Sequence, residues 1–420
     1  MKKKLLFLTS RLPYPTSSGR KNVMFYYCKY LYEMYGYEII NVSFMEDGDD
    51  VSLKPEFIAK TYELKKVGAK NKLKNLILDT VIKNDKPMQV SLYYSKEVNE
   101  EIRKIIEIEN PDLLMCDMVR TSEYLKEYDI PKILDMDDLL SKRYNRQLDI
   151  DLKDVNPYGA FLYTLPKFAQ KILSNKNMKK YILTKEIDLL TKYEIAISEY
   201  YDSIVFVAQN EADELNKRIN SDKSFAVPLG VDINYFSEYI EVNQESNTIS
   251  FMGALSVAHN ETGIIHFCEN IYPMIKLAVP DVKVYIIGGG ATERLKRISE
   301  KDESIVLTGR VEDTREYIKK TDVFICPLLF GSGIKTKNLE AMAMSVPVVT
   351  TEIGAESIGA INNEHWIVED NNEDFANKIV NIFRDNDLKQ KLSKNGFDYV
   401  SEHFSWDMTM KKWEDVINYL

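Results

Sequence analysis

The chain has 420 residues, of which 45% are hydrophobic, and a formal net charge of -10. This length and composition predict two to three domains with a large buried core. The acidic balance and the absence of a long basic block exclude generic nucleic-acid binding, which depends on clustered lysine and arginine meeting phosphates.

The first predicted strand spans Lys4 to Thr9 and follows a charged start that imitates a signal peptide. Its apolar run, Leu5 to Leu8, is far shorter than the hydrophobic region of a signal peptide or a membrane span. The four cysteines form neither a CxxC pair nor a disulfide framework. We therefore expect no metal centre and a reducing, cytoplasmic location.

Helical spacing of apolar side chains follows from Val23 to Met34, and Gly36 is the expected helix stop. Further strands of this first block are expected at residues 39–44, 113–116, 132–135 and 203–207. The stretch from about 148 to 194 is expected to be mostly helical. Short apolar runs that alternate with amphipathic stretches are typical of a parallel sheet covered by helices.

A crossing between two domains is expected near residue 240, because Pro228 and Gly230 precede the polar run EVNQESN. Beyond it, strands are expected in TISFMG, VKVYIIG, SIVLTG, DVFICP and VPVVTT, and the closing FSWDMTMKKWEDVINYL is expected to be one amphipathic helix. The chain is thus predicted to be an α/β protein with two doubly wound, Rossmann-like domains. Their predicted ranges are 1–240 and 241–403, followed by a terminal helix within 404–420.

The loops that follow the strands are the expected ligand-binding loops, because helix N-termini at the carboxyl ends of parallel strands carry free N–H groups and partial positive charge. These loops comprise residues 10–21, 117–121, 136–144, 253–262, 288–292, 309–313 and 327–337. The last, PLLFGSGIKT, is the strongest candidate, since its glycines precede the helical KNLEAMAM and would expose N–H donors to an anion such as a diphosphate.

Two lysines, Lys335 and Lys337, stand at the start of this helix, where positive charge opposes the helix dipole by about 0.3–1 kcal/mol. An anionic ligand would compensate for that opposition. The alternative is a surface ion pair between Lys337 and Glu340, but lysine preceding glutamate is the less favourable order, and such pairs contribute only about 0.2–0.5 kcal/mol. The spacing therefore favours an anion site.

The run SGIKTKNLEAMAMSVPVVTTEIGAESI resembles the donor-site signature of retaining glycosyltransferases of family 4. The likeness extends over nearly the full length, through SRLPYPTSSGRKN, YDSIVFVAQNEADEL, VPLGVDINYF, ISFMGAL, VLTGRVED and the closing FSW segment. It implies the GT-B fold, in which two Rossmann-like domains face each other across a cleft and a C-terminal helix returns to the N-terminal domain.

The resemblance also implies a reaction. A nucleoside diphosphate sugar, with UDP or GDP as the nucleotide, would bind mainly to the C-terminal domain, and a glycan or lipid-linked acceptor mainly to the N-terminal domain. A hexosyl group would move with retention at the anomeric carbon and without a metal ion or other cofactor. Such a reaction would belong to the biosynthesis of cell-surface polysaccharide.

The implied site residues follow position by position. Glu340 would bind the ribose hydroxyls, while Lys335 and Lys337 would face the diphosphate and the sugar as the catalytic cations. Arg20 and Asp137 would face the acceptor. The remaining donor-binding positions are Ser332, Gly333, Ile334, Thr336, Gly309, Arg310, Val311, Gly19 and Gly253. Of these, Ser332 stands where family members usually carry a first glutamate, a departure that concerns the identity and pose of the sugar.

Some of these positions have a purely structural alternative. Arg310 would otherwise be a surface arginine in a tight turn. A basic residue that family members often carry shortly after Gly253 is missing, and His259 or Asn260 would be its substitutes, although ordinary loop polar groups are the favoured interpretation. The glycines at 288–290 lack the full GxGxxG spacing and predict a tight strand-to-helix turn.

The run Asp135-Met-Asp137-Asp138 mimics the metal-binding DxD of another glycosyltransferase fold, and its carboxylates could hold Mg²⁺. The two-domain pattern argues against that interpretation. For Asp137, the alternative to an acceptor-facing role is helix capping.

Two lysine-rich stretches, 65–86 and 166–185, combine apolar periodicity with positive charge. That combination is typical of a membrane-surface helix and also of a solvated helix beside the core, which is the preferred interpretation. A lipid-linked acceptor would favour peripheral attachment at the inner face of a membrane.

Two rival functions fit the same architecture. A donor-binding but inactive partner subunit would account for Ser332. A nucleotide-sugar epimerase would need acid and base side chains near the sugar, and the sequence offers no convincing pair.

Overall fold

The computed structural model describes residues 2–16, 19–148, 167, 170, 174–331 and 333–420. The chain divides into two compact units, the first formed by Met1–Pro228 with Met410–Leu420 and the second by Leu229–Thr409. The sequence predicted the corresponding boundaries near residues 240 and 403.

The first unit contains a seven-stranded parallel sheet in the order β3-β2-β1-β4-β5-β6-β7. The strands are β1 (Lys4–Thr9), β2 (Glu38–Phe44), β3 (Ile58–Leu64), β4 (Leu113–Asp117), β5 (Lys132–Asp137), β6 (Ser203–Phe206) and β7 (Ser224–Ala226). The predictions of β1, β2, β4, β5 and β6 are confirmed. The sequence missed β3 and β7, the two edge strands, because IAKTYEL is largely polar and SFA has only three residues.

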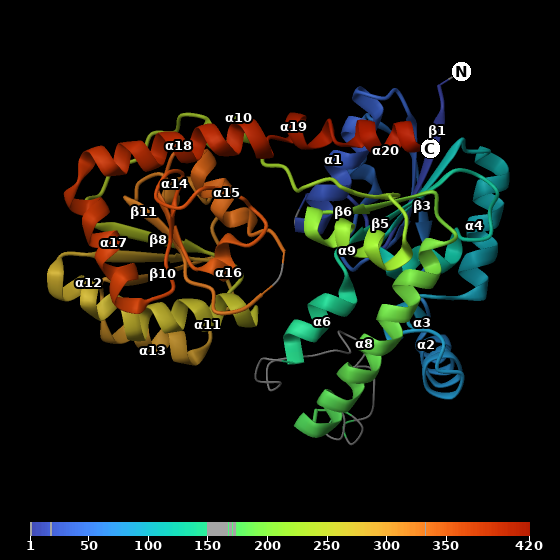
Figure 1. Cartoon of the computed structure of the whole chain (residues 1–420), viewed down its shortest axis with the longest axis horizontal. Coiled ribbons are helices and arrows are strands. Elements are labelled where there is room, and N and C mark those ends of the chain that lie inside the picture. Colours follow the sequence, from blue (N-terminus) through green and yellow to red (C-terminus); the bar gives the residue numbers. More distant parts are fainter. Residues whose placement is uncertain (1, 17–18, 149–166, 168–169, 171–173, 332) are drawn as a thin grey trace. The chain divides into compact units, whose positions relative to one another are not determined.

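Helices cover both faces of this sheet (Figure 1). Tyr27 and Leu31 of α1 are fully buried, and the predicted stop, Gly36, has the left-handed φ of 71° that follows the helix end. The helical elements of this unit are α1 (Gly19–Glu33), η1 (Val51–Leu53), α2 (Ala69–Asn75), the π-helical η2 (Leu76–Ile82), α3 (Met88–Ser91), α4 (Lys96–Glu109), α5 (Met118–Thr121), η3 (Ser122–Tyr124), α6 (Leu140–Leu148), α8 (Lys176–Ser198), α9 (Gln209–Ile219) and α20 (Trp413–Tyr419).

The second unit contains a six-stranded parallel sheet in the order β10-β9-β8-β11-β12-β13. The strands are β8 (Thr248–Met252), β9 (Lys283–Ile287), β10 (Ile305–Gly309), β11 (Val323–Cys326), β12 (Val348–Thr350) and β13 (Ile367–Val368). The five predicted strands are confirmed. The sequence missed β13, an edge strand of only two residues.

Two layers of helices enclose this second sheet, with α11, α12 and α17 packed on one hydrophobic cluster and α15 and α18 on another (Figure 1). The elements are α10 (Ile233–Ser237), α11 (Ala258–His266), the π-helical η5 (Phe267–Ile271), α12 (Tyr272–Ala278), α13 (Glu293–Lys301), α14 (Arg315–Ile318), α15 (Thr336–Ala343), α16 (Glu352–Ala355), α17 (Asn372–Arg384), α18 (Asn386–Phe404) and α19 (Trp406–Met410).

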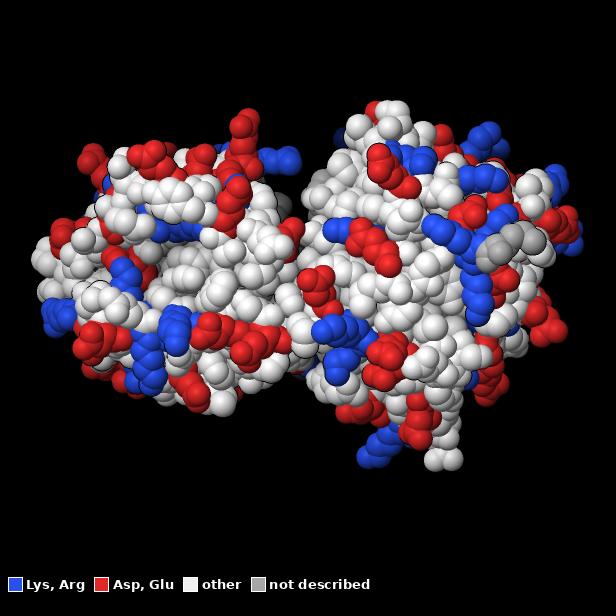
Figure 2. Space-filling model, turned by 90° about the horizontal axis from the view of Figure 1, so that it is seen from above, with Lys and Arg blue, Asp and Glu red and all other residues white. Residues whose placement is uncertain are grey.

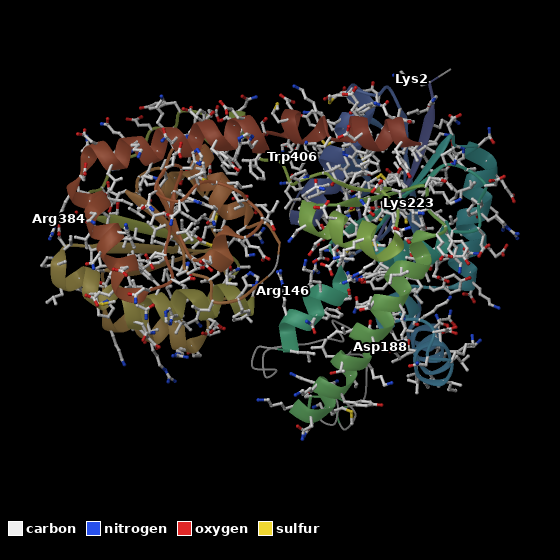
Figure 3. All side chains as sticks on the ribbon, viewed as in Figure 1. Lys2, Arg146, Asp188, Lys223, Arg384 and Trp406 are labelled. Atoms are coloured by element: carbon white, nitrogen blue, oxygen red, sulfur yellow. The ribbon has the colours of Figure 1, made fainter. Side chains whose placement is uncertain are left out.

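The closing segment differs from the single amphipathic helix that was predicted. It forms two short helices, α19 and α20, each anchored by a buried tryptophan. Trp406 (labelled in Figure 3) lies so close to Gly230 of the second unit that a Cβ there would come within 2.4 Å of its ring. Trp413 meets Tyr27 of the first unit edge to face, with ring centroids 4.9 Å apart. Because its two tryptophans anchor in different units, the segment breaks between them.

The surface and cysteines fit the bulk composition. Acidic and basic side chains are interspersed over the face shown in Figure 2. All four cysteines are buried and free. In the described part of the chain, no helix combines the length and apolar character that a bilayer crossing requires.

Candidate functional site

The loop before α15 is shaped by two glycines in the left-handed region. Gly331 has a φ of 140° and Gly333 a φ of 71°, conformations that cost other residues about 1 kcal/mol or more. Lys335 is the N-cap of α15, and its side chain forms no capping hydrogen bond. Ser332 lies outside the described residues.

Lys337 is a cation held in largely apolar surroundings. Its Nζ donates to Oδ1 of Asn260 at 2.5 Å and lies 4.7 Å from the ring centroid of Phe251. Burial lowers the pKa of Lys337, and the neighbouring charge of Glu340 only partly offsets that effect. Among the described residues no carboxylate forms an ion pair with Lys337, so the predicted alternative of a pair with Glu340 is not observed. A desolvated ammonium without a close carboxylate is suited to an anionic ligand.

Lys335 lies beside this ammonium and is almost fully buried, with 6% of its surface exposed. Its Nζ donates to the carbonyl oxygen of Gly333 at 2.6 Å, within the glycine loop. The neutral side chain of His259 completes the group, because burial, Lys337 and Lys335 together lower its pKa to about 4. Two lysines and an uncharged imidazole therefore gather where the glycine loop meets α15.

Gly253 makes room for Lys337. A Cβ at this position would lie 2.9 Å from Nζ of Lys337 and 2.9 Å from the side-chain amide of Asn260. The structure thus brings Gly253 to the lysines, although the site role predicted for it stays a prediction. Asn260, one of the two residues that the sequence offered in place of the missing basic residue, accepts the hydrogen bond of the Lys337 ammonium.

Glu340 sits one turn into α15 and is partly buried. Burial raises its pKa to about 7, although Lys337 and a hydrogen bond from Thr336 lower it. Near neutral pH this carboxyl group therefore exists in both forms. A ligand that donates hydroxyl hydrogen bonds would stabilise the carboxylate.

The other predicted loops of the second unit meet at the same sheet edge. A Cβ on Gly288, whose φ is 144°, would lie 1.9 Å from the carbonyl oxygen of Gly253, so the two loops touch. The backbone N–H of Gly288 donates to the carbonyl oxygen of Gly309 at 3.0 Å. Arg310 is exposed beside this turn, and Val311 packs against the adjoining core. Strands β10, β9, β8 and β11 are neighbours, which is why their loops assemble.

In the first unit, Arg20 lies at the carboxyl ends of β1, β4 and β5, and only 10% of its side chain is exposed. Its guanidinium donates to Asp117 at 2.5 Å, to Asp135 at 2.5 Å and to Asp137 at 3.0 Å. The Ser10 hydroxyl donates to the other oxygen of Asp117. The sequence missed Ser10 and Asp117, although both end or follow a predicted strand.

Burial sets the charges of this cluster. It disfavours ionisation of Asp117, but Arg20 and Ser10 outweigh it and lower the pKa of that carboxyl. For Asp135, burial outweighs Arg20 and raises the pKa to about 7. We call Arg20 with Asp117, Asp135 and Asp137 the arginine cluster.

The neighbours of the DMDD run engage the carboxylate of Asp137 and cap the helix that follows, while the acceptor-facing role predicted for Asp137 stays a prediction. Asp137, with a φ of 67°, contacts Arg20 and Arg143 through its carboxylate. It does not cap α6, because Glu211 and Glu194 accept the N–H groups of Leu139 and Ser141 at that helix start. Gly19, the first residue of α1, is exposed with open space around it. No group of three metal-ligating side chains occurs among the described residues.

Comparison with known proteins connects the second unit to a defined family. Residues 246–385 match the family model described as Glycosyl transferases group 1. An uncharacterized 44.6 kDa protein in the cps region of Klebsiella pneumoniae is 26% identical over 215 residues, which cover 50% of this chain and 54% of that protein. The capsular polysaccharide biosynthesis glycosyltransferase CapM of Staphylococcus aureus is 29% identical over 147 residues, which cover 33% and 38% of the two chains.

These matches support a place in the group 1 glycosyltransferase superfamily. The crystal structure of HepE from Anabaena in complex with UDP aligns over all of both chains with a TM-score of 0.64 and 11% identity. At that identity the likeness shows the fold alone, and together with the two parallel sheets it shows the GT-B fold that the sequence predicted. The chain spans about half or less of the length of these two curated relatives.

Proposed function

We propose that this protein is a glycosyltransferase that moves a sugar from a nucleoside diphosphate sugar to a glycan or lipid-linked acceptor in cell-surface polysaccharide biosynthesis. The observation that carries the proposal is the pair of lysines at the glycine-rich start of α15, of which Lys335 is buried and Lys337 is partly buried. UDP is the favoured nucleotide, since a relative of the same fold was crystallised with it. Assignment to family 4 and transfer of a hexose are part of the proposal.

The geometry supports a specific division of roles. Lys337, Lys335 and the backbone N–H groups of residues 333–336 would bind the diphosphate, while the Glu340 carboxylate would accept hydrogen bonds from the ribose hydroxyls. As the bond between the anomeric carbon and the diphosphate oxygen breaks, the electron pair stays with the leaving diphosphate. Preorganised cations stabilise that developing charge, and loss of one such group typically costs about 2.7–4 kcal/mol of barrier.

Retention follows if the acceptor hydroxyl bonds to the anomeric carbon on the face that the diphosphate leaves. The hydroxyl proton would then pass to the departing phosphate oxygen, the nearest base on that face, so that no protein nucleophile is needed. Neither a metal ion nor another cofactor is required in this scheme. NMR of the product's anomeric configuration tests retention, and turnover after chelation of divalent ions tests the absence of a metal requirement.

A thermal-shift panel of nucleoside diphosphates and their sugars tests the donor class. A ligand at about 100 times its dissociation constant adds about 2.7 kcal/mol to the folded state. We expect a response to one base, and a loss of that response in Lys337→Met. If no nucleotide shifts the unfolding temperature of the native protein, the donor site is wrong.

An inactive partner subunit is the second candidate, because Ser332 replaces the usual glutamate. Such a protein would respond in the thermal-shift panel yet consume no donor sugar with any acceptor. Donor consumption by the purified chain alone would exclude it.

A further inference from the structure

One helical element of the first unit has its apolar side chains on the outside. Residues 69–82, formed by α2 and η2, contain five of the chain's exposed large hydrophobic side chains. These are Leu73 (44% exposed), Ile77 (44%), Leu78 (39%), Val81 (68%) and Ile82 (67%). We call this element the α2/η2 patch. A surface helix normally turns such residues toward the core.

The inner face of the same element is held by polar groups. The Asn75 amide donates to the carbonyl oxygens of Ser91 at 3.1 Å and Tyr94 at 2.7 Å, and the Thr80 hydroxyl donates to that of Ser91 at 2.9 Å. Leu76 reaches a small cluster around Met88. These hydrogen bonds fix the α2/η2 patch in place with its bulkiest aliphatic groups facing solvent. The exposure of those groups is therefore not a result of fraying of the helix.

Positive charge surrounds these aliphatic groups. Residues 65–86 contain seven lysines and two aspartates, a net charge of +5 in a chain of net charge -10. Three of the lysines form ion pairs, Lys83 with Asp79, Lys66 with Asp47 and Lys86 with Glu123. Lys65, Lys70 and Lys74 are exposed and form no ion pair with a described carboxylate. The face in Figure 2, by contrast, mixes both signs.

The composition of the patch distinguishes between occupants. Protein interfaces concentrate their binding energy in tryptophan, tyrosine and arginine, and residues 65–86 contain none of the three. Aliphatic side chains beside unpaired lysines instead match the boundary of an anionic bilayer, where aliphatic groups enter the acyl region and lysines meet phosphate headgroups.

We propose that the α2/η2 patch docks the protein on an anionic lipid surface. This reverses the preferred sequence interpretation of 65–86 as a solvated helix. In the second lysine-rich stretch, 166–185, most positions up to 173 lie outside the described residues. The inference does not use this stretch. The proposal does not rest on the proposed transfer reaction, because a chain that binds vesicles but transfers no sugar would uphold the one and refute the other.

Flotation of the full-length protein with vesicles tests the docking. We expect binding to phosphatidylcholine vesicles that contain phosphatidylglycerol, weaker binding at high salt, and no binding to pure phosphatidylcholine vesicles. The double variant Val81→Ser with Ile82→Ser should reduce the bound fraction at least about tenfold, since two aliphatic side chains lose their buried area. The variant Lys70→Ala with Lys74→Ala should weaken binding about fivefold per lysine at low salt.

A matched control removes two exposed aliphatic side chains elsewhere. Ile108 and Leu277 are 71% and 87% exposed, and their double serine variant should float like the native protein. Thermal unfolding should be unchanged in all variants, because the altered side chains are exposed. No binding of the native protein to anionic vesicles, or equal binding by every variant, would overturn the proposal. So would self-association in solution that the Val81 and Ile82 substitutions abolish, since the patch would then be a protein interface.

Discussion

The two units place cations at equivalent edges of similar parallel sheets, but they neutralise them differently. In the first unit, Arg20 contacts three aspartates that the fold itself supplies. In the second, Lys337 contacts an amide oxygen and an aromatic ring, and no described carboxylate pairs with it. The position at the carboxyl end of a parallel sheet therefore does not determine whether a cation there is neutralised by carboxylates of the protein.

This difference predicts a structural role for Arg20 and a ligand-binding role for Lys337. Arg20 has its counterions within the protein, so its removal would leave buried carboxylates without a cationic partner. Desolvation of the Lys337 ammonium is unfavourable, and an anion bound from outside the protein would offset that free energy. Four substitutions test the contrast, beginning with the largest expected effect.

Arg20→Met should destabilise the first unit by about 3–5 kcal/mol, because it leaves buried carboxylates without their partner. Urea unfolding followed by intrinsic fluorescence measures the loss. Arg103 is the matched control, since its side chain is 54% exposed in an ion pair with Glu100 and its replacement by Met should change stability by less than about 0.5 kcal/mol. Equal effects of the two substitutions would show that the arginine cluster contributes nothing to the fold.

Lys337→Met should lower kcat by two to three powers of ten, which corresponds to the loss of one preorganised charge. The stability of the ligand-free protein should stay the same or rise by up to about 1 kcal/mol, because a desolvated cation is removed. Lys394→Met on α18, where the lysine is 80% exposed, is the control and should leave kcat unchanged. A folded Lys337→Met protein with native turnover would defeat the donor-site assignment.

Gly253→Ala should weaken donor binding about tenfold, a loss of about 1.4 kcal/mol. The new methyl group would occupy the position 2.9 Å from the Lys337 ammonium and displace it. Isothermal titration with the donor found in the thermal-shift panel measures the change. Gly68 has open space around it, so Gly68→Ala should leave the affinity unaltered. Native affinity in Gly253→Ala would mean that Lys337 does not need its observed position.

Glu340→Gln should change the dependence of stability on pH by about 1–3 kcal/mol. Burial raises the pKa of Glu340 from the ordinary 4.5 to about 7. Folding therefore favours the protonated form, and this contribution is complete below about pH 4.5 and is lost as pH rises through 7. The variant should thus gain stability over the native protein at pH 8 but not at pH 4.5, as measured by urea unfolding. A constant difference between the proteins across this range would contradict the shift.

Donor affinity supplies the matching readout for Glu340. In the proposed donor site the ionised carboxylate would accept hydrogen bonds from the ribose hydroxyls, so binding of a nucleotide sugar to the native protein should weaken as pH falls below about 7. The diphosphate of such a donor is doubly esterified and does not titrate there. Glu340→Gln should bind weakly at every pH, and a surviving pH dependence would place the titrating group elsewhere.

Much of the fold could be predicted because buried parallel strands are continuous apolar runs. KLLFLT and VKVYII show such runs. The edge strand β3 does not, because one side of an edge strand lacks a neighbour and tolerates polar residues such as Lys60 and Glu63, and β7 and β13 are too short to show a run. The closing helix was predicted too long because local periodicity does not show that its two tryptophans belong to different units.

The sequence alone determined the two-sheet architecture, the glycine loop and the lysines before α15, because spacing along the chain decides strands, turns and helix starts. Only the tertiary structure decided which charged side chains have a partner within the protein. Asp117 reaches Arg20 and Asn260 reaches Lys337 across 97 and 77 residues of sequence, and the outward face of the α2/η2 patch depends on hydrogen bonds to Ser91. Burial and distant partners set the free energy of a charge, and neither is local to the chain.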